Sequence, residues 1–422
     1  MRQIIDFHIH SKYSRATSKF FDLPEMAKWS EIKGVDIVSA ADFTHPAWFK
    51  NLEANLVEDQ AGSGLYKLKN LNSPTRFLIS TEISCIYNQG NKTRRVHVCI
   101  LVPSLDSAKK FSQALSDRGA KLASDGRPIL GISAKQILEI LLEVDDRAML
   151  IPAHAWTPWF AVFGSKSGFG SLEECFEDLT PHIRAIETGL SSDPAMNWRW
   201  SDLDNITLVS NSDAHSGPQI GREANVMELS EGSYNEIIDI VSKKDKQRFL
   251  YTIEFFPEEG MYHWDGHRDC GFSCSPKETK KHKGLCPKCK KPLTIGVLSQ
   301  VDKLANLSED KINASRHIPY KNIIPLPLII ADYYGMGRDS KRVQELYKEV
   351  VQLAGNEFRA LLDLSYEELK KIMPEALADG IIRTRASKIK IIPGFDGQYG
   401  QVEVFSSKER ATARDNKQAK LF

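Results

Sequence analysis

The first 250 residues of this chain alternate short apolar runs with helical stretches. Seven runs are typical of β-strands, at residues 4–9, 34–41, 76–84, 95–101, 148–153, 183–188 and 206–210. Helical stretches, such as residues 24–33 and 134–144, separate many of them. This rhythm predicts a parallel α/β barrel or a doubly wound sheet. In such folds the carboxyl ends of the strands meet on one side, where an active site is expected.

The first strand carries three polar residues, Asp6, His8 and His10, in the segment IDFHIHSKYS. Side chains alternate between the two faces of a strand, so these three are expected on one face. Burying them is unfavourable unless something binds them. A metal site is therefore one interpretation, and a solvent-facing edge strand with chance histidines is the other.

Further histidines and carboxylates stand at or just beyond the ends of the later strands, which favours the metal interpretation. These residues are Asp42, His45, Glu82, His97, His154, Asp213 and His215. Nitrogen and carboxylate ligands suit zinc, manganese or iron. With His8 and His10 they make nine candidate ligands. Nine ligands are too many for one tetrahedral ion, so two or three metals are expected.

A second candidate metal site follows the change of composition near residue 251. Four cysteines, Cys270, Cys274, Cys286 and Cys289, form two closely spaced pairs. This spacing predicts a closed structural zinc site with four thiolate ligands, against the alternative of four unrelated free thiols. Nearby histidines (His263, His267 and His282) are expected to be loop residues. Seven lysines surround the cluster, at positions 277, 280, 281, 283, 288, 290 and 291. They are expected to form either a phosphate-binding patch or simply a solvated face.

The remainder of the chain predicts a mainly helical region. Apolar residues recur at helical spacing within residues 339–355, and Ser365 with Glu368 forms a capping-box pattern. Residues from about 406 onward are polar and expected to be disordered. The expected domains are a metal-binding α/β domain at 1–250, a zinc-binding module at 251–300, a helical region at 301–405, and a tail at 406–422.

Composition limits the class of protein. Of the 422 residues, 41% are hydrophobic and 26% are charged, as in ordinary globular proteins. The net charge is only +1, so a polyanion would have to be held by local basic patches. No apolar stretch is long enough to span a membrane, and the first residues lack signal-peptide features. Clustered cysteines suit a reducing environment, so a cytoplasmic location is expected.

The order D-x-H-x-H, D-x-x-H, E, H, H and D-x-H resembles the polymerase and histidinol phosphatase (PHP) superfamily. That resemblance implies a distorted (β/α)7 barrel with a trinuclear metal centre that hydrolyses phosphoesters. It assigns one metal to His8, His10, Glu82 and Asp213, and a second to Glu82, His97 and His154. The third would be held by His215 with Asp42 or His45. The chain departs from the pattern at this third site, because residues 14–18 contain no histidine.

Several longer segments resemble endonuclease Q over residues 1 to about 405. They are AHAWTPWFAVFGSKSGFGS, TGLSSDPAMNWRWSD, GREANV, DGHRDC and IPGFDGQYG. The resemblance implies a DNA repair endonuclease that cuts on the 5′ side of uracil, hypoxanthine, xanthine or abasic sites. Active-site zinc, manganese or magnesium and one structural zinc are the expected cofactors. Asp213 and Glu82 are the residues whose loss is expected to abolish activity.

The aromatic and Gly/Ser-rich segment 156–171 follows the candidate ligand His154. It either caps the barrel core or holds an extruded nucleotide against the metals. The candidate DNA-binding residues are Trp156, Trp159, Lys166, Ser167, Asn197, Arg199 and Arg222. Two other functions stay open: a small-molecule phosphoesterase, which would use the same metals, and a non-catalytic nucleic-acid-binding scaffold.

The last residues, QAKLF, combine Gln418 with Leu421 and Phe422. The pattern resembles the short peptide by which bacterial repair proteins bind the sliding clamp. A sliding clamp is therefore a predicted partner, reached through two apolar anchors. The alternative is that the tail folds back onto the protein.

Overall fold

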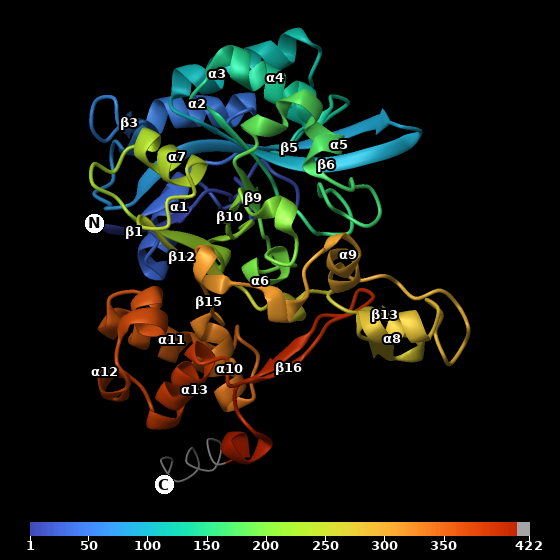
Figure 1. Cartoon of the computed structure of the whole chain (residues 1–422). Helices are drawn as coiled ribbons and strands as arrows, with labels where there is room; N and C mark the ends of the chain where they lie inside the picture. The colour runs from blue at the N-terminus through green and yellow to red at the C-terminus, as the bar shows by residue number, and fades with distance from the viewer. Residues whose placement is uncertain (412–422) are drawn as a thin grey trace.

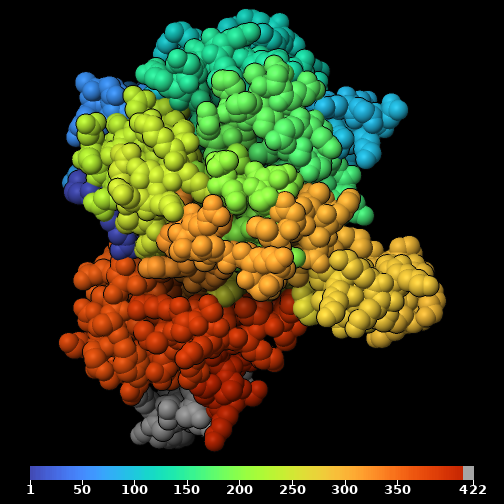
Figure 2. Space-filling view, viewed as in Figure 1, coloured from blue at the N-terminus to red at the C-terminus, as the bar shows by residue number. Residues whose placement is uncertain are grey.

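The computed structural model describes residues 1–411. These residues form an α/β body, a small cysteine-containing module and a helical region (Figure 1). In that view the body lies at the top, the helical region lies below it, and the module projects to the right. The space-filling view shows the module standing out from the rest of the surface (Figure 2).

A mixed sheet forms the centre of the body. β1 (Arg2–Asp6) pairs in parallel with β2 (Ile37–Ser39), and β2 pairs in parallel with β5 (Arg76–Gln89). On its other side β1 pairs antiparallel with β11 (Ala224–Glu228), and β11 with β12 (Phe249–Glu254). The alternation of strands and helices in the sequence predicts a parallel sheet. The observed sheet is only partly parallel, because several neighbouring strands pair antiparallel.

A hairpin joins β5 to β6 (Lys92–Val102), and its tip extends beyond the body. β6 continues antiparallel to β8 (Met149–Pro152), while the short strand β7 (Ile129–Leu130) runs parallel to β5. β9 (Ala185–Glu187) and β10 (Thr207–Val209) form a separate parallel pair. All seven predicted strands are therefore present, and β3 (Leu56–Glu58) and β4 (Leu65–Leu68) extend the sheet beyond β5.

Amphipathic helices pack around the sheet. α1 (Leu23–Lys33) begins at the Asp22 cap and ends at Gly34, which takes the left-handed conformation. α4 (Ala134–Val144) has the bounds that the sequence predicts, and a capping box of Ser133 and Gln136 begins it. α2 (Pro46–Asn55), α3 (Leu105–Asp117) and α7 (Tyr234–Ser242) complete the longer helices, and α5 (Leu172–Phe176) and α6 (Pro194–Asn197) are short. Their apolar faces and the sheet bury the main core.

The cysteine-containing module is inserted between two strands of the central sheet. It contains β13 (Asp265–His267), β14 (Phe272–Cys274) and α8 (Pro276–Lys281), and α9 (Val297–Leu304) follows it. The chain then re-enters the sheet as β15 (Tyr320–Asn322), parallel to β12. The body therefore extends past the expected boundary at residue 250 and regains a strand after residue 301.

The helical region contains α10 (Leu326–Tyr334), α11 (Lys341–Ala354), α12 (Tyr366–Ile372) and α13 (Glu375–Arg385). The capping box of Ser365 and Glu368 is confirmed. A π-helical turn spans Arg359–Asp363, and a hairpin joins β16 (Lys390–Ile392) to β17 (Gln401–Glu403). No helix among residues 1–411 is long and apolar enough to cross a membrane.

A buried ion pair fixes the helical region against the body. The Lys33 ammonium, at the end of α1, lies 2.7 Å from the Glu357 carboxylate, and both side chains are almost completely buried. The same carboxylate accepts a 2.6 Å hydrogen bond from the Tyr347 hydroxyl. Buried charges are stable only when paired in this way, so the network favours one orientation of the two parts.

The final described residues also contact the helical region. Glu409 lies 2.7 Å from Arg383, and Arg410 lies 2.9 Å from Asp332. The expectation of disorder from residue 406 is therefore wrong for residues 406–411, because these ion pairs hold them. The predicted clamp-binding residues Gln418, Leu421 and Phe422 lie outside the described residues.

Candidate metal centre

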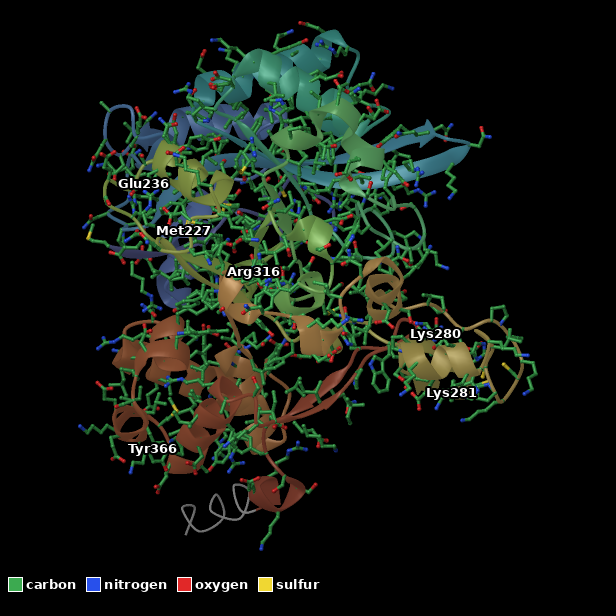
Figure 3. All side chains as sticks on the ribbon, in the orientation of Figure 1. Met227, Glu236, Lys280, Lys281, Arg316 and Tyr366 are labelled. Carbon is green, nitrogen blue, oxygen red and sulfur yellow. The ribbon has the colours of Figure 1, made fainter. Side chains whose placement is uncertain are left out.

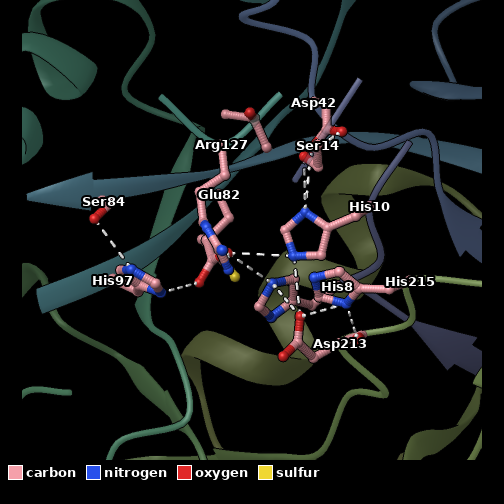
Figure 4. Close-up of polar contacts among 12 residues, drawn as sticks. His8, His10, Ser14, Asp42, Glu82, Ser84, His97, Arg127, Asp213 and His215 are labelled. Carbon is pink, nitrogen blue, oxygen red and sulfur yellow. Dashed lines mark hydrogen bonds and ion pairs between the residues drawn. The ribbon is translucent and has the colours of Figure 1, made fainter. Parts of the chain in front are cut away.

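Two sets of ligand atoms meet at one side of the sheet and share Glu82 (Figure 4). His8, His10, Glu82 and Asp213 form the first set, and Glu82, His97 and His154 form the second. Within each set the donor atoms lie within 4.8 Å of one another. These are the first two ligand sets that the PHP resemblance implies, and the structure brings them together from five separate places in the sequence.

Glu82 bridges the sets because its two oxygens face opposite ways. Its Oε1 lies 2.8 Å from His97 Nδ1 and 3.2 Å from His154 Nε2. Its Oε2 lies 3.3 Å from His10 Nε2. A carboxylate with this arrangement can serve two neighbouring cations.

The backbone around the centre is held in unusual conformations. Asp42, His154 and Asp213 all have positive φ, at 40°, 30° and 47°. Non-glycine residues rarely adopt this region, and such strain persists where the surrounding structure enforces it. One enforcing group is Asp6, whose buried carboxylate accepts hydrogen bonds from the backbone of His8 and of residues 212 and 221. Strand β1 thus ends at Asp6, which supports the ligand loops and belongs to neither ligand set.

Each of the four ligand histidines has a partner for the ring nitrogen that faces away from Glu82. The pairs are His8 with Glu187 at 2.9 Å, His10 with Ser14 at 3.2 Å, His97 with Ser84 at 3.1 Å, and His154 with Thr157 at 3.1 Å. Outer partners of this kind fix the tautomer and the direction of a metal-ligating imidazole. The four rings are therefore oriented for coordination through the nitrogen that faces the centre.

One buried nitrogen shows that these residues fit a metal. His8 Nε2 has no hydrogen-bond partner among the described residues, although it is fully buried. It lies 3.5 Å from Glu82 Oε2 and 3.7 Å from Asp213 Oδ1. An unpaired buried polar atom is unfavourable, and a divalent cation among these three atoms would satisfy it.

The pKa directions agree with a strongly coupled site. Burial opposes ionisation of Glu82, but His97, Arg127 and His8 hold the pKa of its carboxyl well below the usual range. Burial lowers the pKa of His97 to about 4, so this imidazole is neutral and its Nδ1 can bind a cation. Burial also opposes protonation of His10, yet its bonds to Asp213, Asp42 and Glu82 raise the pKa of that ring to about 10.

The third predicted ligand set is not assembled. Asp42 accepts hydrogen bonds from Ser11 and Ser14 and lies 3.4 Å from His10 Nδ1, so its oxygens are used in orienting that ring. His45 caps α2 by accepting from the Trp48 amide at 3.4 Å. His215 lies against the His10 ring, with its Nδ1 2.9 Å from the Asp213 carbonyl. The structure thus does not join His215 to Asp42 or His45.

Glu187 and Arg127 belong to the site but were absent from the sequence-based set. Glu187 stands at the end of β9, so the rule that found the other strand-end residues applies to it as well. Arg127 lies in an irregular loop, and its NH1 donates to Glu82 Oε2 at 3.0 Å. No strand pattern marks that loop, so only the three-dimensional structure places this arginine at the centre.

Two predicted DNA-binding residues are part of the core. The Trp156 indole is buried and donates to the Asn197 side-chain oxygen at 2.7 Å, and Asn197 is completely buried. Phe163 and Trp200 pack beside the Trp156 ring. For these two residues the structure favours the core-capping alternative, because neither presents a free polar group to a ligand.

The other predicted DNA-binding residues fall into two groups. Ser167 donates to the Arg95 carbonyl, Arg199 pairs with Asp302, and Arg222 donates to the carbonyls of residues 212 and 213. These three are therefore engaged in intramolecular contacts. Trp159 and Lys166 remain exposed, and the Trp159 ring lies edge-on to Tyr262.

The module contains another metal-ligand set, which differs from the predicted one. His267, Cys270, Cys286 and Cys289 have donor atoms within 4.8 Å of one another, whereas Cys274 is not part of this set. Strands β13 and β14 explain the difference, because His267 pairs with Phe272 near the turn and Cys274 pairs with Asp265 farther away. The Cys274 thiol is buried 3.2 Å from the Thr279 hydroxyl.

The seven lysines of the module are all exposed. Lys280 and Lys281 lie on α8 (Figure 3). Lys280 forms an ion pair at 3.7 Å with Asp302, which an exposed setting makes weak. The lysines thus give the module a positively charged surface beside the body.

Parts of the chain are similar to known protein sequences. Residues 325–388 match the family described as the MJ0043 C-terminal domain. An uncharacterized protein of Methanocaldococcus jannaschii, MJ0043, is 32% identical over 271 residues, which are 62% of this chain. The chain spans only 33% of the length of that relative.

Two solved structures resemble the chain over almost its whole length. The lesion-specific endonuclease PfuEndoQ from Pyrococcus furiosus gives a TM-score of 0.84 at 27% identity, covering 98% of this chain and 99% of that one. Endonuclease Q in complex with a 27-mer duplex that carries an abasic lesion gives 0.83 at 28% identity, covering 97% and 98%. The match includes the body, the module and the helical region. It confirms the resemblance that the sequence motifs indicate: the chain has the fold of endonuclease Q.

Proposed function

We propose that this protein is a metal-dependent DNA repair endonuclease that cuts the phosphodiester on the 5′ side of a deaminated base or an abasic site. The observation that carries the proposal is Glu82, which joins two sets of metal ligands at the centre of an endonuclease Q fold. The abasic duplex held by a structural relative supports a DNA substrate of this kind.

The chain's own residues would hold two divalent cations. His8, His10 and Asp213 would hold one, His97 and His154 the other, and Glu82 both. Such ions, when bound, polarise a phosphoryl oxygen and make water a nucleophile at neutral pH. The side chains supply the positions: Glu187, Ser14, Ser84 and Thr157 orient the ligand rings, and the backbone is strained at the ligands His154 and Asp213.

Two metals account for the ligand sets that the structure assembles. The identity of these metals as zinc, manganese or magnesium is part of the proposal. A further zinc is proposed in the module, with His267, Cys270, Cys286 and Cys289 as its ligands. Three thiolates and one imidazole are a common tetrahedral zinc set.

DNA would be held by two exposed features of the molecule. Trp159 and Lys166 lie on the segment that follows the ligand His154, and the lysines of the module offer further phosphate contacts. An extruded base is easiest to obtain where pairing is already weak, as at a deaminated or missing base. Trp159 is the exposed aromatic residue of that segment and is proposed to stack on a nucleotide.

The proposal is tested with labelled duplexes that carry uracil, hypoxanthine, xanthine or an abasic site at one position, with an undamaged duplex as the control. The expected result is a single nick 5′ to the lesion, dependent on manganese, magnesium or zinc. Hydrolysis of phosphomonoesters without any nick in lesion DNA would instead favour a small-molecule phosphoesterase. Binding without any hydrolysis would favour a scaffold.

A sliding clamp remains a predicted partner of Gln418, Leu421 and Phe422. A purified clamp should bind the full chain with micromolar affinity, and deletion of residues 418–422 should abolish that binding. Nicking of naked DNA should be unchanged by the deletion. Equal clamp affinity with and without these residues would contradict the prediction.

A further inference from the structure

Arg127 reaches the metal centre from a loop between two short elements, Leu122–Ser124 and β7. The loop is held close to the ligands. The Gly126 amide donates to the Tyr13 carbonyl at 3.0 Å, and Asp125 accepts from the Arg127 amide at 3.0 Å. A Cβ atom on Gly126 would stand 2.3 Å from both Asp42 and Ser14, so only glycine allows this approach. The position of Arg127 is therefore fixed by its neighbours.

The guanidinium contacts the ligand oxygen of the first metal set. Arg127 NH1 lies 3.0 Å from Glu82 Oε2, the oxygen that also faces His10 Nε2 at 3.3 Å and His8 Nε2 at 3.5 Å (Figure 4). A cation held by these three residues would use the same oxygen. Since arginine stays charged at all relevant pH values, Arg127 competes with that cation for Glu82.

The rest of the guanidinium is available to another anion. Among residues 1–411 the Arg127 side chain forms its hydrogen bond and ion pair with Glu82, through NH1. The side chain is 24% exposed, whereas Glu82 is buried, so the guanidinium forms part of the accessible wall of the centre. Arginine has five N–H donors in a planar fork that matches two oxygens of a phosphate.

We propose that Arg127 has two successive partners at this site. Before the metals bind, it pairs with Glu82 and holds the carboxylate in position. With a cation on Glu82, the guanidinium would be free to donate to a non-bridging oxygen of the scissile phosphate, where it would stabilise the negative charge that develops. The second step rests on the proposed phosphodiesterase function, whereas the first concerns only this chain and its metals.

The test of the first step needs no substrate. Calorimetric titration of the metal-free protein with Mn²⁺ is expected to show roughly five- to tenfold tighter binding for Arg127→Ala than for the unchanged protein, because a neighbouring positive charge is removed. Arg15→Ala is the matched control. Arg15 is exposed, and its backbone amide, which alanine keeps, bonds to Asp125 of the same loop, so the substitution removes one arginine charge without touching a ligand.

The second step is tested by single-turnover cleavage at saturating Mn²⁺ and abasic duplex. Arg127→Ala is expected to be slower by roughly a hundredfold, with partial recovery in Arg127→Lys and no change in Arg15→Ala. Bis(p-nitrophenyl) phosphate serves as a second substrate. If the protein cuts this diester but not lesion DNA, the endonuclease proposal fails. The rate of diester cleavage by Arg127→Ala still tests whether Arg127 contacts the phosphate.

Two outcomes would overturn the inference. Unchanged or weaker Mn²⁺ binding by Arg127→Ala would show that the arginine does not compete for Glu82 and supports the fold instead. Unchanged diester cleavage by the same variant at saturating metal would show that it does not contact the phosphate. Thermal melting of each variant checks the fold, and Arg127→Lys provides the comparison if Arg127→Ala is unstable.

Discussion

The two metal-ligand clusters of this protein are built in opposite ways. The ligands of the central cluster come from residues as far apart as His8 and Asp213, and most of them are buried. The ligands of the module all lie between His267 and Cys289, and Cys289 is exposed. The central cluster is thus a product of the completed fold, whereas the module is a small structure that its metal would hold together.

This difference predicts different consequences of losing a ligand. A ligand lost from a rigid, well-packed frame removes chemistry but leaves the frame. A ligand lost from a module with a very small core removes the structure itself, because structural zinc supplies folding free energy directly. The four predictions that follow test this contrast, beginning with the largest expected effect.

Asp213→Asn should slow strand cleavage by roughly a thousandfold or more, since a metal contributes several kcal/mol to such reactions and each 1.36 kcal/mol is tenfold in rate. The melting temperature, the zinc content of the module and most of the affinity for abasic duplex should be retained. Single-turnover nicking, calorimetry and metal analysis provide these measurements. Full nicking activity in this variant would refute the proposed centre.

Replacing Cys286 and Cys289 by serine should remove one equivalent of zinc and weaken binding to lesion DNA by roughly tenfold or more. The active-site metals should remain. Metal analysis by inductively coupled plasma and fluorescence anisotropy are the measurements. His267→Ala and Cys274→Ser form a matched pair, of which only the first is expected to lose zinc. The reverse result would restore the four-cysteine set predicted from the sequence.

Glu187→Gln should weaken metal binding at the centre by about 10- to 100-fold, the usual effect of removing an outer partner of a ligand histidine. The reason is that an amide no longer holds His8 Nδ1–H as strongly as the carboxylate at 2.9 Å does. Mn²⁺ calorimetry measures this effect. At saturating Mn²⁺ the rate of cleavage should largely recover, and a rate that stays low would mean that Glu187 acts in the chemistry.

The last prediction concerns the stability of the body at different pH values. Burial raises the pKa of Glu254 to about 8 from an ordinary value of 4.5. Between these values the folded protein keeps a proton that the unfolded chain releases, so this residue lowers stability as the pH rises from 4.5 to 8. Glu254→Gln should flatten that decline. Urea unfolding at pH 5, 6.5 and 8 tests it, and an unchanged slope would contradict the assignment.

The elements that the sequence predicts well are those with strong local signals. Residues 134–144 combine helical spacing with a Ser133 and Gln136 cap, and the structure begins and ends α4 at those residues. His8, His10, His154 and Asp213 are found because each follows a recognisable strand, and Glu82 and His97 because they are polar residues within strands β5 and β6. A list of the polar residues on and after these strands therefore already approximates the centre, although β6 runs antiparallel to β5 and β8 and brings His97 there from within a strand.

The missed features depend on pairing between distant segments. The β5–β6 hairpin is predicted as two strands at 76–84 and 95–101, which are too short to meet at the two-residue Gly90-Asn91 turn, whose positive φ angles are typical of a hairpin. Cys274 has the spacing of a zinc ligand, and only the register of β13 on β14 shows that His267 lies nearer the other thiols. Arg127 has no periodic context at all. Each of these depends on which residues face each other in space.

The insertion of the module between β12 and β15 also sets an order of events during synthesis. β12 ends at Glu254, and its partner β15 begins only at Tyr320. One edge of β12 therefore stays without its strand on the ribosome while the module emerges, and an open edge recruits other chains. A zinc-folded module shortens the loop that must close before β15 can pair. Zinc supply would thus govern how much protein reaches the native state, before it governs the proposed binding of DNA.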